Sequence, residues 1–380
     1  MKTQQKPNHH RRVSGFTLVE LLVVITIIGI IAGLTIPALY GVFVTGKETA
    51  LKVEMESISA ALEQYHDDFN EYPPDFSDWN IVRRHYKKIF PRMLGSELAL
   101  LQRLTDVDPT NDTDTSATPD LHNAAGMDRA EALVWALGGF SKDPQFPFTG
   151  EGGPLELVAQ SGSTRVYQIN LDRPNKFFDL DTSKMNLSTI DSSVASSATN
   201  RYVSTDDSDL FPTYAATKEG APYVYFDART YRYNHGTDAA PNFNGYASAE
   251  FGQVRPYVSE VVNTRTSTAD FSSRVEALQS WEFMDDDEYQ LIAPGLDAVH
   301  GDVANFDVDG DSTPDPIYFQ YPSGKAITAI VDSGINTAGD LEVPNVSRYQ
   351  ESSTFGKRIE TQQDNITNFS RLRIIDDVRE

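Results

Sequence analysis

The sequence predicts an α+β protein with a long N-terminal helix and strands concentrated in its C-terminal part. Three observations predict this class. An uncharged, mostly apolar run from Leu21 to Leu39 leads into a helical stripe of apolar residues that reaches Phe69. Residues 75–215 mix helical patterns with polar loops, and strand patterns dominate from about residue 220. Hydrophobic residues make up 39% of the 380, enough for a packed core and too many for wholesale disorder.

The composition excludes several kinds of site. The chain has no cysteine, so it contains no disulfide, cysteine nucleophile, iron–sulfur cluster or thiolate zinc site. Lys and Arg total 32 against 55 Asp and Glu, a formal net charge of −23. Such a chain presents no basic stripe for a phosphate backbone, and we expect no nucleic-acid partner.

The N-terminus has the layout of a membrane anchor. Residues 1–15 are polar and hold four cations and no acid. The run from Leu21 to Leu39 would form a helix about 28 Å long, close to the hydrocarbon thickness of a bilayer. Cations before this run predict that the N-terminus stays in the cytoplasm and that the rest of the chain is exported.

Two simpler interpretations of this segment leave observations unexplained. A cleaved secretory signal peptide has a shorter apolar stretch and a small-residue cleavage site, which residues 37–40 (Pro-Ala-Leu-Tyr) do not provide. An ordinary single-span anchor does not account for Glu20, because a carboxylate inside an apolar membrane helix costs about 2.5–3.5 kcal/mol. We therefore expect Glu20 to have a partner.

Residues 15–20, Gly-Phe-Thr-Leu-Val-Glu, resemble the processing site of type IV pilins and type II secretion pseudopilins. The resemblance implies that prepilin peptidase cuts between Gly15 and Phe16, that Phe16 is N-methylated, and that the apolar helix is kept. It implies that Glu20 pairs with the terminal amine of a neighbouring subunit during assembly. It also places Pro37 where these proteins commonly carry a helix-kinking proline.

The same resemblance implies a pilin-like fold, in which the long helix packs on an antiparallel β-sheet head with a large inserted region of helices and loops. The expected organisation is a leader at 1–15, an N-terminal helix at 16–72 with its transmembrane half at 16–40, a helical and Ser/Thr/Asp-rich elaboration at 73–215, a β-sheet head with an acidic calcium loop at 216–335, and a C-terminal extension at 336–380.

Beyond the apolar run, the helix carries a single apolar stripe. Its residues follow one another at intervals of four and three: Leu51, Met55, Ile58, Leu62, Tyr65 and Phe69. This spacing predicts packing against the chain's own head, with a coiled-coil seam as the alternative. Pro73 and Pro74 predict that the helix ends just before them.

The remaining patterns predict shorter elements. Residues 81–104 read as one helix, and residues 128–131 have the spacing of a capping box at the start of another. Residues 181–210 are rich in Ser, Thr, Asp and Asn and read as a surface loop. Two hairpins are expected, one pairing 223–226 with 230–233 and the other pairing 316–321 with 326–331.

An aspartate-rich loop is the best candidate for a metal site. Carboxylates occupy its positions 1, 3, 5 and 9: Asp307, Asp309, Asp311 and Asp315. Oxygen ligands at alternate positions can surround a calcium ion, although Ser312 and Tyr318 stand where an EF-hand needs glycine and glutamate. The loop resembles the shorter calcium loops of extracellular repeats. The alternative is a solvated acidic turn.

Residues 290–302 resemble the segment that opens the calcium loop of the major pseudopilin. The resemblance adds Asp297 and Asp302 as candidate ligands of lower rank. Two departures weaken it, because Pro294 precedes the glycine and Ala298 replaces the usual second glycine.

Two short segments resemble those of a protease. The residues around Asp332 look like the aspartate segment of subtilisin-type enzymes, and those around His235 look like their histidine segment. The two occur in the wrong order, and no segment supplies the serine nucleophile. We therefore expect no enzyme activity.

The resemblance to pseudopilins implies a structural subunit of a type II secretion pseudopilus. Its partners would be copies of itself, other pseudopilins, prepilin peptidase and the inner-membrane assembly platform, with the head in the periplasm. The alternative is a type IV pilus subunit for adhesion, motility or DNA uptake, although the C-terminal disulfide common in those pilins is missing. A membrane-anchored hydrolase is the remote alternative.

Overall fold

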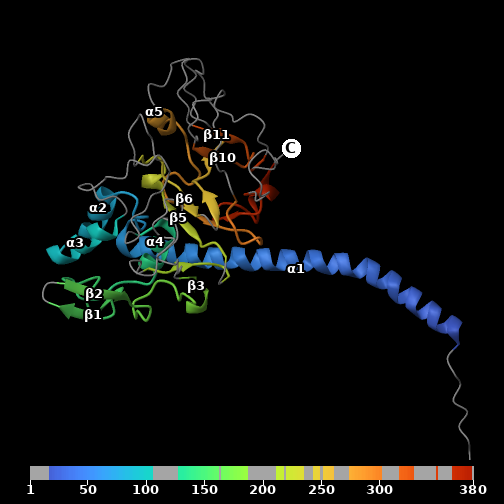
Figure 1. The fold of residues 1–380 in the computed structure, drawn as a ribbon. Coiled ribbons are helices and arrows are strands. Elements are labelled where there is room, and N and C mark those ends of the chain that lie inside the picture. Colours follow the sequence, from blue (N-terminus) through green and yellow to red (C-terminus); the bar gives the residue numbers. More distant parts are fainter. Residues whose placement is uncertain are drawn as a thin grey trace, which may run out of the picture. The chain divides into compact units, whose positions relative to one another are not determined.

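The computed structural model describes residues 17–105, 127–161, 164–186, 211–217, 220–234, 243–248, 251–260, 274–301, 316–328, 348–349 and 362–378. The chain divides into two compact units, residues 1–47 and residues 48–380. The α-helices are α1 (Leu18–Phe69), α2 (Trp79–Ile89), α3 (Gly95–Leu104), α4 (Arg129–Leu137) and α5 (Arg274–Gln279) (Figure 1).

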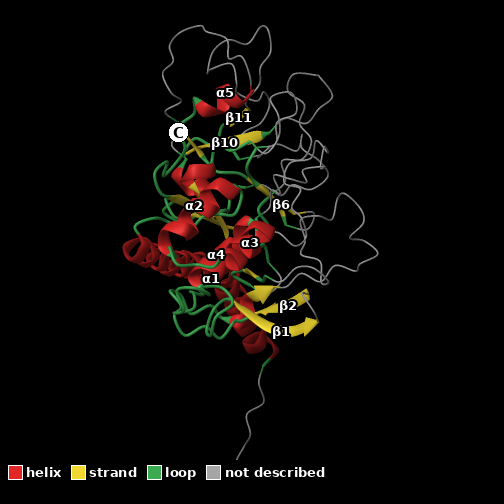
Figure 2. Cartoon of the chain, turned by 90° about the vertical axis from the view of Figure 1, so that its left-hand side faces the viewer, coloured by secondary structure: helices red, strands yellow, loops and turns green. Residues whose placement is uncertain are grey.

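The described strands are short and form several small sheets (Figure 2). They are β1 (Leu155–Ser161), β2 (Thr164–Ile169), β3 (Met185–Asn186), β4 (Thr213–Tyr214), β5 (Val224–Asp227), β6 (Tyr246–Ser248), β7 (Gly252–Val254), β8 (Val258–Ser259), β9 (Tyr289–Ala293), β10 (Ile317–Tyr321), β11 (Ala326–Thr328) and β12 (Ile366–Thr367). The pairs are antiparallel except β8 with β10. The predicted α+β class is confirmed.

The second half of α1 buries its apolar stripe in the larger unit. Met55, Ile58, Leu62 and Tyr65 are at most 1% exposed, and Leu51 is partly buried. Met55, Ile58 and Leu62 pack with apolar residues of α4 and of strands β5 and β9, and Tyr65 packs against Phe69 and Phe140. The prediction that the stripe packs on the chain's own head is confirmed.

A three-stranded sheet in the order β12-β9-β5 lies at the centre of this packing. Side chains of a strand alternate between its two faces. Accordingly, Tyr225 and Leu291 contribute to the core around α1, whereas Val224, Phe226 and Ile292 contribute to a second core on the other side, shared with β8, β10 and β11. The sheet is therefore covered on both faces, by helices on one side and by more strands on the other.

A third core joins the end of α1 to the short helices. Trp135 of α4 lies fully buried among aromatic side chains, and its indole Nε1 donates a hydrogen bond to the Tyr86 hydroxyl at 2.9 Å. Phe140 and Phe148 pack edge-on against Tyr86 of α2. Helices α2, α3 and α4 thus form one layer over the last turns of α1.

The helix α1 ends just before Pro73 and Pro74, as predicted, and the backbone conformation of Asn70 ends it. Asn70 has a left-handed backbone (φ 55°), and its N–H donates to the carbonyl of His66. Asparagine tolerates this conformation better than most residues and often closes a helix. The end of α1 is therefore set before Pro73 and Pro74 are reached.

The expected helix over 81–104 is wrong as a single element. The structure has α2 and α3, separated at residues 90–94. Pro91 lies in this gap. It has no backbone N–H and disfavours helical conformation in Phe90, so the first helix ends there. The apolar positions on both sides of the break still face one core.

The expected hairpin of 223–226 with 230–233 is also wrong. β5 pairs with β9, and residues Ala228–Thr230 form a 3₁₀ turn. The carboxylate of Asp227 accepts the Arg229 backbone N–H, and the Thr230 hydroxyl donates to the Asp227 carbonyl at 2.8 Å. These local hydrogen bonds replace the strand ladder after residue 227.

Two other predictions are confirmed. β10 and β11 form the expected hairpin as far as Thr328. Asp128 and Glu131 make the full capping box at the start of α4, each side chain accepting from the other residue's backbone N–H. The polar loop expected at 181–210 lies mostly outside the described residues.

Truncation of the α1 stripe should destabilise the head. Leu62→Ala should lower the free energy of unfolding by about 2–5 kcal/mol, because Leu62 is completely buried between α4 and the sheet. The measurement is guanidinium unfolding of the detergent-solubilised chain, followed by tryptophan fluorescence. Val53→Ala, at a position 54% exposed on the same helix, is the control and should change this free energy by less than about 0.5 kcal/mol. Equal effects at the two positions would contradict the packing described here.

Candidate functional site

The first half of α1 is apolar on every side. Between Leu18 and Phe43, 16 large hydrophobic residues are more than 40% exposed within the chain. Glu20 is the one charged residue between Leu18 and Gly46. By length and composition, α1 contains a stretch able to cross a membrane. A helix that is apolar all round is stable only in lipid or when buried among other apolar surfaces.

The start of α1 carries a capping box. The Glu20 carboxylate accepts hydrogen bonds from the Thr17 backbone N–H at 2.9 Å and from the Thr17 hydroxyl at 2.7 Å. In return, the Thr17 hydroxyl oxygen accepts the Glu20 N–H at 3.2 Å. The box satisfies backbone donors that a helix start leaves free. Sequence reasoning missed it, although Thr-x-x-Glu at residues 17–20 is its usual signature.

The other predicted site residues are only partly described. Gly15 and Phe16 lie outside the described residues, as do Asp302, Asp307, Asp309, Asp311 and Asp315. Pro37 lies within α1. Asp297 is exposed in the turn after β9, where its side chain accepts the Val299 N–H and its own N–H donates to the Asp364 carboxylate at 3.4 Å.

In the described part of the chain, no group of three His, Asp or Glu side chains is placed to hold a metal ion. Among the described residues, Asp297 and the neighbouring Asp364 therefore have no third such side chain with which to hold an ion. The calcium prediction depends on residues that are not described, and it stays a prediction. His235 and Asp332 of the protease-like segments also lie outside the described residues.

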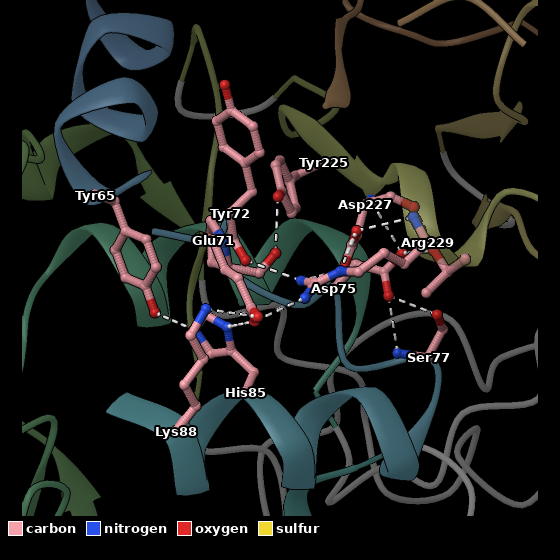
Figure 3. Close-up of polar contacts among 12 residues, drawn as sticks. Tyr65, Glu71, Tyr72, Asp75, Ser77, His85, Lys88, Tyr225, Asp227 and Arg229 are labelled. Carbon is pink, nitrogen blue, oxygen red and sulfur yellow. Dashed lines mark hydrogen bonds and ion pairs between the residues drawn. The ribbon is translucent and has the colours of Figure 1, made fainter. Parts of the chain in front are cut away.

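A buried polar network surrounds the point where α1 ends (Figure 3). Glu71 is its central carboxylate. It accepts from His85 Nδ1 at 3.1 Å, from Lys88 Nζ at 2.8 Å and from an Arg229 amino group at 3.2 Å. The other ring nitrogen of His85, Nε2, lies 2.8 Å from the Tyr65 hydroxyl. One carboxylate thus links the last turns of α1 to α2 and to the turn after β5.

Arg229 extends this network to two further anchors. Its guanidinium lies 2.6 Å from the carboxylate of Asp227 and donates to the Tyr72 carbonyl at 2.9 Å. Burial raises the pKa of Asp227 to about 6, against the pull of the adjacent Arg229 cation. Buried charges are costly without partners, and here Glu71, Asp227 and Arg229 each have a partner of opposite sign.

Asp75 forms the second half of the network. Its carboxylate accepts from the Ser77 N–H and hydroxyl and from the Thr230 hydroxyl. It is 1% exposed, and the amide of Asn244 donates to it at 3.4 Å. The segment after the prolines is thereby fixed to the turn that follows β5.

Tyr65, His85 and Glu71 are aligned like a proton relay. The Tyr65 hydroxyl is completely buried, however, and burial lowers the pKa of His85 and keeps its ring neutral. An ionised Glu71 can only accept, so Nδ1 carries the ring proton and Nε2 accepts from Tyr65. A hydroxyl with no access to solvent does not meet a substrate, and this arrangement positions helices.

Two more contacts attach α1 to the head. Glu54 accepts from Lys184 and Tyr214 at 2.7 and 2.8 Å, and from Tyr223 at 3.0 Å. Two residues earlier, the buried Lys52 ammonium donates to the carbonyls of Thr367 and Asn368. Burial lowers the pKa of Lys52. These contacts hold both the sheet and the C-terminal segment against α1.

Comparison with known proteins gives the origin of the N-terminal segment. Residues 10–36 match the family described as the prokaryotic N-terminal methylation motif. The resemblance of this segment to pilins and pseudopilins is confirmed. The chain is also similar to the type II secretion system core protein G of Pseudomonas aeruginosa and to that of Aeromonas hydrophila, with 41% identity over 63 residues in each case.

The similarity to these two pseudopilins is confined to the N-terminal region. It covers 17% of this chain and 44% of each relative, so the chain spans less than half the length of the curated relatives it matches. No solved structure matches the chain significantly. The prepilin-type N-terminus is therefore established, whereas the head has no matched counterpart in these two relatives.

The network around Glu71 makes a prediction about acid stability. Hydrogen bonding from His85, together with Lys88 and Arg229, holds the pKa of Glu71 well below its usual range. Because this pKa is lower in the folded chain than in the unfolded one, the stabilisation is complete above about pH 5 and is lost as the pH falls below about 4.3. Glu71→Gln should remove this part of the acid-induced loss, on the order of 2 kcal/mol between pH 5 and pH 3.

The measurement is the free energy of unfolding of wild type and Glu71→Gln at several pH values, because groups common to both cancel in the difference. Glu63→Gln, at an exposed carboxylate that accepts from Tyr72, is the matched control. Parallel pH curves for wild type and Glu71→Gln would show that Glu71 carries no such linkage.

Proposed function

We propose that this chain is a structural subunit of a type II secretion pseudopilus. The observation that carries the proposal is the first half of α1, which is apolar on every side and holds a single carboxylate in its first turn. The similarity of the N-terminal region to core protein G supports the secretion system rather than a surface pilus. The function is mechanical, and no residue is assigned a catalytic role.

The proposed sequence of events follows from the residues. Prepilin peptidase cuts between Gly15 and Phe16, Phe16 becomes the methylated N-terminus, and the helix stays in the inner membrane with the head in the periplasm. Subunits are then drawn from the membrane by the assembly platform and polymerise with each other and with other pseudopilins. The growing rod pushes secreted proteins across the outer membrane.

Glu20 has the central role in this scheme. In the single chain its carboxylate is occupied by Thr17 of the same helix. In the filament it would pair with the Phe16 amine of a neighbouring subunit, which would neutralise a charge that is expensive in an apolar surrounding. Pairing between subunits would therefore favour assembly over dissociation.

A deletion strain tests this proposal. We expect folded secreted hydrolases to accumulate in its periplasm, measured by quantitative proteomics of periplasm and medium, and wild-type chain to restore export. An intact secretome together with missing surface filaments would identify a pilus subunit instead. Loss of a hydrolytic activity in the purified chain on labelling with serine- or aspartate-directed inhibitors would support the remote enzyme alternative.

Two variants in the same strain separate processing from assembly. Glu20→Ala should be cut to mature size but should give no sheared or pelleted filaments, because the carboxylate lies beyond the cut. Gly15→Leu is the processing control and should stay full-length in the membrane, since the peptidase needs a small residue at this position. Normal filaments from Glu20→Ala would refute the assembly role.

We also propose that the acidic loop at 307–315 binds calcium. The support is chemical, because carboxylates at alternate positions supply the hard oxygen ligands that calcium prefers. An ion that binds only the folded head stabilises it by mass action. The head should therefore melt at a lower temperature in EGTA than in millimolar calcium, and Asp307→Asn with Asp309→Asn should abolish the difference. Equal melting of the wild-type chain in both solutions would remove calcium from the proposal.

A further inference from the structure

The buried stripe of α1 continues toward the N-terminus of the helix as two charged residues. Lys52 lies three residues before Met55, and Glu48 lies four residues before Lys52, so both share the face that enters the core. Glu48 is 4% exposed and Lys52 is 9% exposed. Charged side chains are almost never this deeply buried unless they are paired. The segment that pairs with them therefore belongs to the packing of α1.

That segment lies far from α1 in the sequence. It comprises residues 362–378, named the strap here, and it lies beside the part of α1 that belongs to the larger unit (Figure 1). The Lys52 ammonium donates to two successive strap carbonyls, that of Thr367 at 2.8 Å and that of Asn368 at 3.1 Å. One cation of the helix is thus held by the backbone of the strap.

The strap makes a second contact with α1 and is itself fixed to the head. The Glu48 carboxylate lies 3.4 Å from Nε of Arg373. Strand β12 of the strap pairs with β9 of the central sheet. Ile366 is completely buried in the core around α1, and Ile374 is completely buried in the core on the other side of the sheet. The strap therefore connects the helix to both cores.

The charges of α1 favour one axial position of the helix against the strap. Lys52 is the one Lys or Arg between Glu48 and Phe69, and Glu56 follows it by four residues. If α1 moved by four residues toward its N-terminus, about 6 Å, Glu56 would face the strap carbonyls and Lys52 would face Arg373. Both contacts would then be repulsive. The opposite movement would place Glu48 against the same carbonyls.

The apolar stripe alone does not exclude such a shift. After the same movement, Leu62 would take the place of Ile58, and Phe69 would take the place of Tyr65. Packed helices can move past one another by one turn between two discrete arrangements. A buried polar or ionic group that fixes register is the best-attested use of such groups in proteins. The two buried charges therefore supply a constraint that these apolar contacts lack.

We propose that the strap, together with Glu48 and Lys52, forms a register lock that holds α1 at one axial position in the head and opposes its withdrawal by one turn. The lock is a property of the single chain. The pull that it would resist is the one on the helix during assembly, and this part rests on the function proposed above. Such a pull would pass from the two charges to the strap, and through β12 to the central sheet.

The absence of cysteine from the chain permits a direct measurement of the register. Val53→Cys and Lys142→Cys, both at exposed positions, carry spin labels in the full chain in detergent. Lys142 follows Phe140, which packs against Phe69 in the last turn of α1. The distance between the labels, measured by double electron–electron resonance, therefore changes when α1 moves along its axis.

We expect a single distance in the otherwise wild-type chain. K52E with E56K moves the pattern of one acid and one base by four residues along α1, and should therefore populate a distance about 4–6 Å longer. E56K alone is the matched control, because it keeps Lys52 in place, and it should stay at the wild-type distance. Thermal melting shows that each head is folded. An unshifted distance in folded K52E/E56K would overturn the lock.

Lys52→Met provides a second test, which does not require a stable shifted state. It removes the two hydrogen bonds and keeps a side chain of similar length, so the amides of residues 48–55 should exchange with deuterium about tenfold faster while those of 58–66 keep their rates. R371M is the control, because Arg371 is an exposed strap cation whose ion pair is with Asp377 of the strap. Wild-type protection of residues 48–55 in Lys52→Met would also overturn the lock.

These outcomes are separable from the proposed function. The distance and exchange measurements use the purified chain, so they stand even if the deletion strain secretes normally. If wild-type chain forms filaments, K52E/E56K that shows the longer distance should give a smaller pelleted fraction than E56K. Equal assembly of these two variants would overturn the role of the lock in resisting the pull.

Discussion

The head depends on the burial of one face of the second half of α1. Ile58 and Leu62 are inaccessible to solvent between α4 and the β12-β9-β5 sheet, and that sheet is itself covered on its other face. Apolar packing alone does not fix a helix against sliding along its axis. Polar contacts do so, because Lys52 and Glu54 of α1, and Glu71 just beyond its end, each bind partners at a defined position. Apolar burial and polar contacts together therefore fix the position of α1 in the head.

Burying the ionisable groups of the network at the end of α1 costs free energy, which other interactions must offset. Asp75, Asp227 and His85 are buried, and buried ionisable groups destabilise a protein unless their hydrogen bonds are complete. Arg229 contacts two carboxylates and a backbone carbonyl, so it satisfies three acceptors with one side chain. Such an arrangement fixes the path of the chain more than it stabilises the fold, because it sets where the chain leaves α1 and where α2 begins.

Much of this fold could be predicted from the sequence where the signal is local. The α1 stripe, the stop after Phe69 and the box at Asp128 follow from periodicity and capping chemistry, and all are found. The elements that were predicted wrongly lie where two local sequence signals compete. Pro91 splits an otherwise continuous apolar pattern, and Asp227 and Thr230 turn a strand-like segment into a 3₁₀ turn.

The polar network could not be predicted, because its members are separated by up to 169 residues and no spacing connects them. The box at Thr17 and Glu20 could have been, since both residues lie within the motif that revealed the N-terminus. Both hydrogen bonds from Thr17 go to one oxygen of the Glu20 carboxylate, Oε2, so the other oxygen can still accept from a second chain.

Net charge is a poor guide to the local charges on a protein surface. A chain with −23 overall excludes a long cationic surface but allows a short one, and a single helical turn is enough to hold Arg83, Arg84 and Lys87. These three side chains are exposed because α2 buries its other face, with Val82, His85 and Tyr86, against the core at the end of α1. Helix α2 therefore has two effects. It covers the end of α1, and it presents positive charge on the surface of an acidic chain.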